Sequence, residues 1–186
     1  IGAAVTDQRT RLLGAAAALL AFAALGLWDD LRALAPQVRF AVQLLIAPIA
    51  AWILIEPSAS RGSLLLLFVA AIWIVGFVNV FNFMDGINGI SALTALIAGL
   101  AYAVSAGRVD DAGAQLAALA VAGAALGFLP FNFPTARVFL GDVGSYFLGA
   151  ALAMLAVRLL WAGAGLLEVA APLALYCADT AVTLLR

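Results

Sequence analysis

Long apolar runs constrain this chain more than any other feature of its sequence. A transmembrane helix needs about 20 largely apolar residues, and runs of that length follow one another along the chain. They are rich in Ala and Leu and lack the alternation of a membrane strand. Only helices and closed barrels satisfy every backbone hydrogen bond in lipid. The sequence therefore predicts an all-α fold, a polytopic membrane bundle of about seven helices, with spans over residues 12–28, 39–55, 64–83, 89–106, 113–131, 143–162 and 165–184.

The composition requires lipid as the solvent of these helices. Hydrophobic residues make up 67% of the chain and charged residues only 10%, whereas a soluble domain carries about 25% charged residues. One water-exposed globule cannot bury so much apolar surface. The net charge of −1 also argues against a nucleic-acid partner. The expected partner of the surface is the lipid bilayer.

Alternate crossing of the membrane distributes the polar segments unequally between its two sides. One side receives four acidic motifs, at Asp29–Asp30, Asp85, Asp142 and Asp179. The other side receives Glu56, Arg61, Arg108, Asp110 and Asp111. Arginines fall on both sides, so the positive-inside rule does not decide the orientation. The convergence of acidic motifs predicts a functional site on the first side.

The most informative of these motifs is Asn79-Val-Phe-Asn82-Phe-Met-Asp85-Gly86-Ile-Asn88-Gly89. The spacing of three between Asn82, Asp85 and Asn88 would place them on one face of a helix or helical turn. The two glycines permit a tight backbone and close approach of a ligand. Amide and carboxylate oxygens suit Mg²⁺. The alternative interpretation is a polar loop at the membrane edge.

Two further acidic motifs have structural and functional interpretations. Asp29 and Asp30 repel each other and stay ionised only beside water, Arg or a divalent cation, or they form a solvated helix end. Asp142 and Ser145 have N-cap character at the start of a helix. The same position suits a ligand of a metal-bridged pyrophosphate.

Two charged residues on the same side are less specific. Arg137 is expected either to clamp a phosphate or pair with a carboxylate, or to anchor the chain at the interface. Asp179 lies within an apolar run and is expected to face the bundle or the surface, where it bonds a neighbouring helix or contacts a ligand.

Three motifs together resemble a known family. Gly26-Leu-Trp-Asp29-Asp30, Asn79-x-x-Asn82-Phe-Met-Asp85-Gly-Ile-Asn88-Gly and Phe139-Leu-Gly-Asp142-Val-Gly-Ser resemble, in order and spacing, the polyprenyl-phosphate N-acetylhexosamine-1-phosphate transferases of glycosyltransferase family 4. The resemblance runs from about Gly26 to Arg186. The motifs are most similar to those of the bacterial lipopolysaccharide and O-antigen initiating enzymes (WecA and WbpL types). The MraY-type phospho-MurNAc-pentapeptide transferases are more distant.

The resemblance implies a reaction and a location. The enzyme would transfer N-acetylhexosamine-1-phosphate from a UDP-sugar to undecaprenyl phosphate and release UMP, as the initiating step of lipopolysaccharide or related cell-envelope glycan synthesis. It would require Mg²⁺, with Mn²⁺ as a second candidate. The active site would face the cytoplasm at a bacterial inner membrane, and a homodimer is compatible with the resemblance.

The resemblance also implies roles for individual residues. Asn82 and Asp142 would contact the metal, with Asp85 close by. The pair Asp29 and Asp30 would deprotonate or orient the lipid phosphate. Catalytic roles thus fall to Asp29, Asp30 and Asp85. Phe139 would stack on the uracil ring and the Gly86–Gly89 turn would approach the base, and the full set of expected substrate contacts is Asn79, Gly86, Asn88, Gly89, Arg137, Phe139 and Asp179.

Other interpretations and two departures remain. The first alternative is an MraY-type transferase that uses UDP-MurNAc-pentapeptide. Alternatives of another class are a transporter with an ion site at Asp179 and the broken helix near Asp85, and an inactive scaffold. Some family members carry Asp where this chain has Asn88. The family also has an N-terminal helix and a His-containing loop, whereas this chain has no His, so residues 1–186 are expected to be one transmembrane transferase domain, as a fragment with little activity of its own.

Overall fold

The computed structural model describes residues 2–55 and 61–185, and every regular element in these ranges is an α-helix. All seven helices in the described part are long and apolar enough to cross a membrane. Each overlaps one predicted span, so the all-α membrane bundle is confirmed and the chain is a multi-pass membrane protein. The helices are α1 (Gly2–Arg32), α2 (Pro36–Ile55), α3 (Arg61–Met84), α4 (Ile90–Arg108), α5 (Ala112–Asn132), α6 (Gly141–Trp161) and α7 (Leu166–Leu184).

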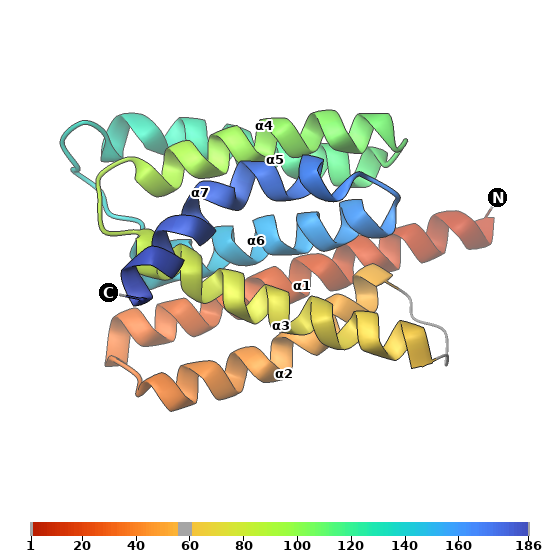
Figure 1. Ribbon diagram of the computed structural model, residues 1–186, viewed down its shortest axis with the longest axis horizontal. Helices are drawn as coiled ribbons and strands as arrows, with labels where there is room; N and C mark the ends of the chain where they lie inside the picture. Colours follow the sequence, from red (N-terminus) through yellow and green to blue (C-terminus); the bar gives the residue numbers. More distant parts are fainter. Residues whose placement is uncertain (1, 56–60, 186) are drawn as a thin grey trace.

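The helices run up and down, so their connections gather at two ends of the bundle. Figure 1 shows the α1–α2, α3–α4 and α5–α6 connections at one end, together with the C-terminal end of α7. We call this the acidic end, because it carries Asp29–Asp30, Asp85, Asp142 and Asp179. The α4–α5 and α6–α7 turns lie at the opposite end. The predicted sorting of acidic motifs is therefore confirmed, apart from Glu56, which lies outside the described residues.

Helix α6 is the centre of the bundle. It packs against all six other helices, and 72% of its span is buried, more than in any other described helix. Gly149 shows why small residues are needed here. A Cβ at this position would lie 2.9 Å from the Cβ of Phe81 on α3, which is closer than two such atoms approach. Close approach of helices through small residues is typical of membrane bundles.

The α1–α2 connection is shorter than the predicted segment over 29–38. Helix α1 continues to Arg32, so Asp29 and Asp30 lie within its final turns rather than in a loop. The Asp29 Oδ1 atom accepts a hydrogen bond of 2.7 Å from the Leu34 amide. Helix α2 then starts directly at Pro36, whose fixed φ suits the first helical position. The side chain of Asp29 thus stabilises the turn that follows it.

Charges at the opposite end are paired between neighbouring helices. The Arg158 Nε atom lies 2.6 Å from Asp111 Oδ2, and Asp111 Oδ1 also accepts from the Ala114 amide at the start of α5. Arg108 on α4 lies 2.8 Å from Glu168 on α7. These contacts account for four of the charges at this end as links between helices.

Candidate active site

Four helices meet at the acidic end and supply its polar side chains. Helices α1, α2, α3 and α6 form a closed group, because α1 packs on α2 and α6, and α3 packs on the same two helices. Each contributes two or more polar residues near this end, namely Asp29, Asp30, Arg39, Gln43, Asn79, Asn82, Asp142 and Ser145.

Asp29 is held inside this group by an arginine. Its side chain is only 4% exposed, and Oδ2 lies 2.7 Å from the Arg39 guanidinium on α2. The Tyr146 hydroxyl of α6 donates to the same oxygen at 3.5 Å. Removing a carboxylate from water is costly unless a partner compensates its charge, and Arg39 supplies that partner. The sequence motif predicts the need for such a cation without identifying which residue supplies it.

Asp30 points instead to the start of α6. Its Oδ1 accepts from the Asp142 amide at 2.9 Å and its Oδ2 from the Val143 amide at 3.0 Å. These amides belong to the first turn of a helix, where N–H groups lack helical partners and the dipole favours negative charge. The N-cap character predicted for Asp142 and Ser145 is therefore wrong. The capping carboxylate comes from Asp30 on another helix, and Leu140 at the N-cap position gives no side-chain bond.

Asp142 and Asn82 face each other across α6 and α3. The Asn82 Nδ2 group donates to Asp142 Oδ1 at 2.6 Å and to Ser145 Oγ at 2.9 Å. The carboxyl groups of Asp142 and Asp29 are close enough to influence each other electrostatically. Three of the four predicted metal or paired-aspartate residues thus lie in one connected cluster, and Asp30 joins it through the backbone of α6.

The structure separates residues that the spacing of three had placed on one face. Helix α3 ends at Met84, and the Asp85 amide donates to the Asn82 carbonyl at 3.2 Å in a tight turn. Asn88 donates to the Pro134 carbonyl at 3.3 Å, away from the partners of Asn82. The helix stops before Asp85 and Asn88, so the three residues do not share a face of α3. Asp85 is joined to Asn82 by a turn, as the alternative of a helical turn predicts.

Asp85 lies in this turn and is about half-buried. Burial raises the pKa of its carboxyl above the ordinary value, and a hydrogen bond with Ser91 partly opposes the change. The Ser91 hydroxyl lies 3.0 Å from the Tyr176 hydroxyl on α7. Ser91, close to Asp85 in the chain, thus contacts the seventh helix.

Gly89 and Asn132 join the turn after α3 to the loop before α6. The Gly89 amide donates to Asn132 Oδ1 at 2.7 Å, and Asn132 Nδ2 donates to the Val138 carbonyl at 2.9 Å. Gly89 has a φ of 81°, and a Cβ there would lie 2.8 Å from the Phe133 ring. Glycine is therefore required at position 89 by both conformation and space. A Cβ at Gly86 would meet nothing within 4 Å, so no such constraint applies there.

The remaining predicted contacts lie on the surface of the acidic end. Phe139 is 75% exposed, and Asn79, Arg137 and Asp179 are also exposed. Among the described residues, the ion pairs do not include Arg137 or Asp179. The structure therefore brings Asp29, Asp30, Asn82 and Asp142 together, while it leaves Phe139, Arg137 and Asp179 outside the hydrogen-bonded cluster.

The cluster offers few protein ligands to a cation. Within residues 2–55 and 61–185, no three His, Cys, Asp or Glu side chains lie close enough together to hold a metal. Asp142 and the oxygen of Asn82 form a two-ligand set. Mg²⁺ in phosphate-handling sites takes one or two carboxylates and completes its shell with water and substrate phosphates. The residues fit Mg²⁺ bound with its substrate and do not form a closed cage.

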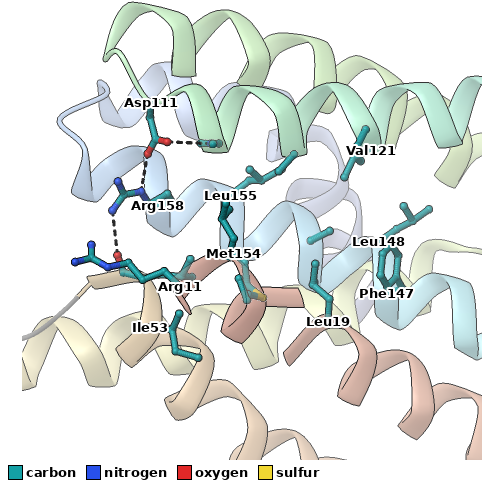
Figure 2. A pocket seen from close by; sticks show the side chains of 18 of the residues that line it. Arg11, Leu19, Ile53, Asp111, Val121, Phe147, Leu148, Met154, Leu155 and Arg158 are labelled. Carbon is teal, nitrogen blue, oxygen red and sulfur yellow. Dashed lines mark hydrogen bonds and ion pairs between the residues drawn. The ribbon is translucent and has the colours of Figure 1, made fainter. Parts of the chain in front are cut away.

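A cavity lies away from this cluster. Figure 2 shows it between α1, α2, α5 and α6, with a volume of about 680 Å³ and a lining that includes Leu19, Phe147 and Met154. Arg11 and the Arg158–Asp111 pair lie at its polar edge. The cavity contains none of the predicted site residues, so the acidic end remains the candidate active site.

Comparison with known proteins assigns the family. The family model for glycosyl transferase family 4 matches residues 12–160, a stretch that contains all three motifs. The chain belongs to glycosyl transferase family 4.

Curated relatives of this family 4 chain carry the name phospho-N-acetylmuramoyl-pentapeptide-transferase. The protein from Limosilactobacillus fermentum is 33% identical over 159 residues, which cover 76% of this chain and 49% of the relative. The Streptococcus agalactiae protein is 30% identical over 164 residues (78% and 49%). The Lactiplantibacillus plantarum protein is 42% identical over 90 residues (48% and 28%). The chain spans about half or less of the length of these relatives.

Three residues that sequence reasoning did not select support the site of this family 4 chain. Arg39 neutralises Asp29, Gln43 accepts from Asn79, and Asn132 fixes the Gly89 turn. A signal existed for the first two, because Arg39 and Gln43 are polar, four residues apart on one face of an apolar helix. Asn132, at the end of an apolar run, carried no comparable pattern.

Proposed function

We propose that this chain is the membrane core of a transferase that moves a phospho-N-acetyl-sugar from a UDP-linked donor to undecaprenyl phosphate and releases UMP. The observation that carries the proposal is the cluster of Asp29, Asp30, Asn82 and Asp142, built by three helices at one end of the bundle. The family assignment supports the same chemistry.

The names of the relatives favour UDP-MurNAc-pentapeptide as the donor. The motif similarity pointed first to UDP-N-acetylhexosamine donors of lipopolysaccharide or O-antigen synthesis. The curated relatives, however, are phospho-N-acetylmuramoyl-pentapeptide transferases, and they support the alternative more strongly. We therefore propose the phospho-MurNAc-pentapeptide transfer as the reaction. UDP-GlcNAc and related sugars form the second candidate, supported by the motif similarity alone.

The chemistry demands positioning and charge compensation more than a strong base. An acceptor phosphate is already anionic at neutral pH, since its second pKa is about 6. Two anionic substrates must approach each other in line, which fixed ligands and a cation permit. Asn82 and Asp142 would hold Mg²⁺, which supplies neutralisation of the phosphates. Mn²⁺ is a second candidate.

The contacts of the paired aspartates suggest positioning roles. Asp29 is engaged with Arg39 and the Leu34 amide, and Asp30 with two amides of α6. We propose that the pair fixes the start of α6, and with it Asp142, at the acidic end. Burial raises the pKa of the Asp85 carboxyl above its ordinary value, and we propose Asp85 as a carboxyl that exchanges a proton during the reaction. Phe139 and Arg137 are exposed and available to a uracil ring and to a phosphate.

The location follows from the substrates. A water-soluble nucleotide donor and a lipid acceptor meet only at a membrane surface, and the cluster lies at the helix ends (Figure 1). We propose that the acidic end faces the cytoplasm of a bacterial inner membrane. A homodimer stays a prediction.

A donor panel tests the proposal. Membranes that contain the full-length protein are supplied with undecaprenyl phosphate, Mg²⁺ and either UDP-MurNAc-pentapeptide or UDP-GlcNAc, and UMP release is measured. Release with the first donor alone supports our main proposal, and release with the second supports the lipopolysaccharide-type alternative. If neither donor gives lipid-dependent UMP, the transferase proposal is wrong.

A further inference from the structure

Gln43 is a fully buried polar side chain in the middle of an apolar helix. It is 0% exposed, and one of its polar atoms, Nε2, is buried without a hydrogen-bond partner. An unpartnered buried donor is costly, and native structures keep few of them. Packing alone does not explain a Gln at this position, because a Leu or Met would fill the same space. Its presence next to the candidate site therefore requires another explanation.

The other end of the Gln43 amide contacts a predicted substrate residue. Gln43 Oε1 accepts a hydrogen bond of 2.5 Å from Asn79 Nδ2 on α3. The same Nδ2 group donates to the Val75 carbonyl one turn earlier at 2.8 Å. A side-chain NH₂ group has two protons, so these two acceptors use both. The amide of Asn79 is thereby fixed, and its carbonyl oxygen is the atom left to contact anything else.

Asn82, one turn along α3, is fixed in the same way. Its Nδ2 protons go to Asp142 Oδ1 and Ser145 Oγ, which again leaves the amide oxygen for a ligand. The two asparagines of the Asn-x-x-Asn motif thus bond to different neighbouring helices, α2 for Asn79 and α6 for Asn82. Helix α6 contributes both acceptors for Asn82, whereas α2 contributes one acceptor for Asn79 and α3 itself the other.

We propose that Gln43 is a positioning residue for the transfer reaction. It holds the Asn79 amide so that an oxygen, and not an NH₂ group, faces the substrates, where it accepts from a donor group or contacts a hard cation. The inference rests on the proposed function, since it assigns Gln43 a role in that same site. Arg39, one turn before Gln43 on α2, pairs with Asp29, so α2 orients side chains of both α1 and α3.

A double-mutant cycle tests this role in the full-length protein. Gln43→Met removes the acceptor at similar volume, and Gln43→Glu keeps an acceptor oxygen. We expect Gln43→Met to lower kcat/KM about tenfold. Gln43→Glu keeps the acceptor but buries a carboxyl, so it should recover only part of that loss. In an Asn79→Ala background, Gln43→Met should cause less than about a twofold further loss, because its target is already absent.

Three results would overturn the inference: full kcat/KM in Gln43→Met, an additive loss in the double variant, or an equal loss in a matched control. The control is Trp73→Phe, which removes another buried, unpartnered donor on α3 and should leave kcat/KM unchanged. A second cycle measures thermal unfolding midpoints of the same variants in detergent. It reports the Gln43–Asn79 contact even if no donor gives UMP, so failure of the transferase proposal and failure of this inference are distinguishable.

Discussion

Asp30 and Asp142 are 112 residues apart in the sequence, yet the Asp30 carboxylate accepts a hydrogen bond of 2.9 Å from the Asp142 amide. A second bond to the Val143 amide makes Asp30 the cap of α6. The helix that carries Asp142 is therefore fixed at its first turn by a residue of α1. These bonds join the Asp29–Asp30 motif to the motif around Asp142, a contact that neither sequence motif predicts.

Asp30→Ala is expected to weaken both stability and activity. Loss of a capping side chain costs about 1 kcal/mol, and the freed first turn of α6 no longer fixes Asp142. Asp30→Asn keeps one acceptor oxygen and should recover part of the loss. Thermal unfolding in detergent and UMP release measure the two effects.

Asp111 supplies the matched control for that cap. It caps α5 through the Ala114 amide at the opposite end of the bundle. Asp111→Ala removes a cap and also the partner of Arg158, so it should lower the unfolding midpoint at least as much while the folded protein keeps its kcat/KM. Equal activity losses in both variants would show that capping affects the reaction only through general stability.

Arg39→Ala should destabilise the protein strongly. It leaves the Asp29 carboxylate, 4% exposed, without its cation, and breaking a buried pair from one side costs about 3–5 kcal/mol. Arg137→Ala is the comparison, because Arg137 is exposed and unpaired among the described residues. Arg137→Ala should change the free energy of unfolding by no more than about 0.5 kcal/mol, as is usual for a surface substitution. It should raise the KM for the anionic donor.

Gly26→Ala is expected to separate α1 from α6. A Cβ at Gly26 would overlap the backbone carbonyl of Asp142, and backbone cannot move aside as a flexible side chain can. Overpacking of this kind costs about 1–3 kcal/mol. Gly76→Ala on α3 meets nothing within 4 Å and should leave stability equal or slightly higher. An unchanged midpoint in Gly26→Ala would contradict the close crossing of α1 and α6.

Asp85 should give the protein a pH-dependent stability. Burial raises the pKa of Asp85 in the folded state above its ordinary value of 3.8. Between these two pKa values the folded state binds more protons than the unfolded state, so stability falls as pH rises through that window. Asp85→Asn removes this fall, and its unfolding midpoint should exceed that of the wild type most clearly above the window. Parallel pH curves for the two proteins would contradict the burial of an ionisable Asp85.

Metal dependence should map to Asn82 and Asp142. Chelation is expected to abolish UMP release, and added Mg²⁺ or Mn²⁺ to restore it. Asp142→Asn should lower kcat about a hundredfold or more, because misplacement of reacting groups has effects of that size, and should raise the Mg²⁺ concentration needed. If Asp142→Asn keeps full activity, the metal role proposed for it is wrong.

The sequence was a good guide to elements whose signal is local. Each predicted span is confirmed as a helix, because a single run of about 20 apolar residues in lipid satisfies its backbone hydrogen bonds only as a helix. Helix ends were less accurate. Asp29 and Asp30 lie within α1, since the Asp29 side chain itself accepts from Leu34 and allows a short turn. Asn82, Asp85 and Asn88 do not share a face of one helix, because α3 ends at Met84 and the other two residues lie in the turn after it.

By itself, then, the sequence predicted a membrane bundle of about seven helices with its acidic motifs at one end, and its motifs identified the family. The lengths of the apolar runs predict the helices, and their alternation across the bilayer predicts the end at which the acidic motifs lie. Both are properties of contiguous segments. Only the tertiary structure decided which partners those motifs have: Arg39 for Asp29, the start of α6 for Asp30, and Gln43 for Asn79. Such pairs depend on which helices pack together and with what rotation. That is set by small-residue crossings such as Gly26 against α6, which no local pattern specifies.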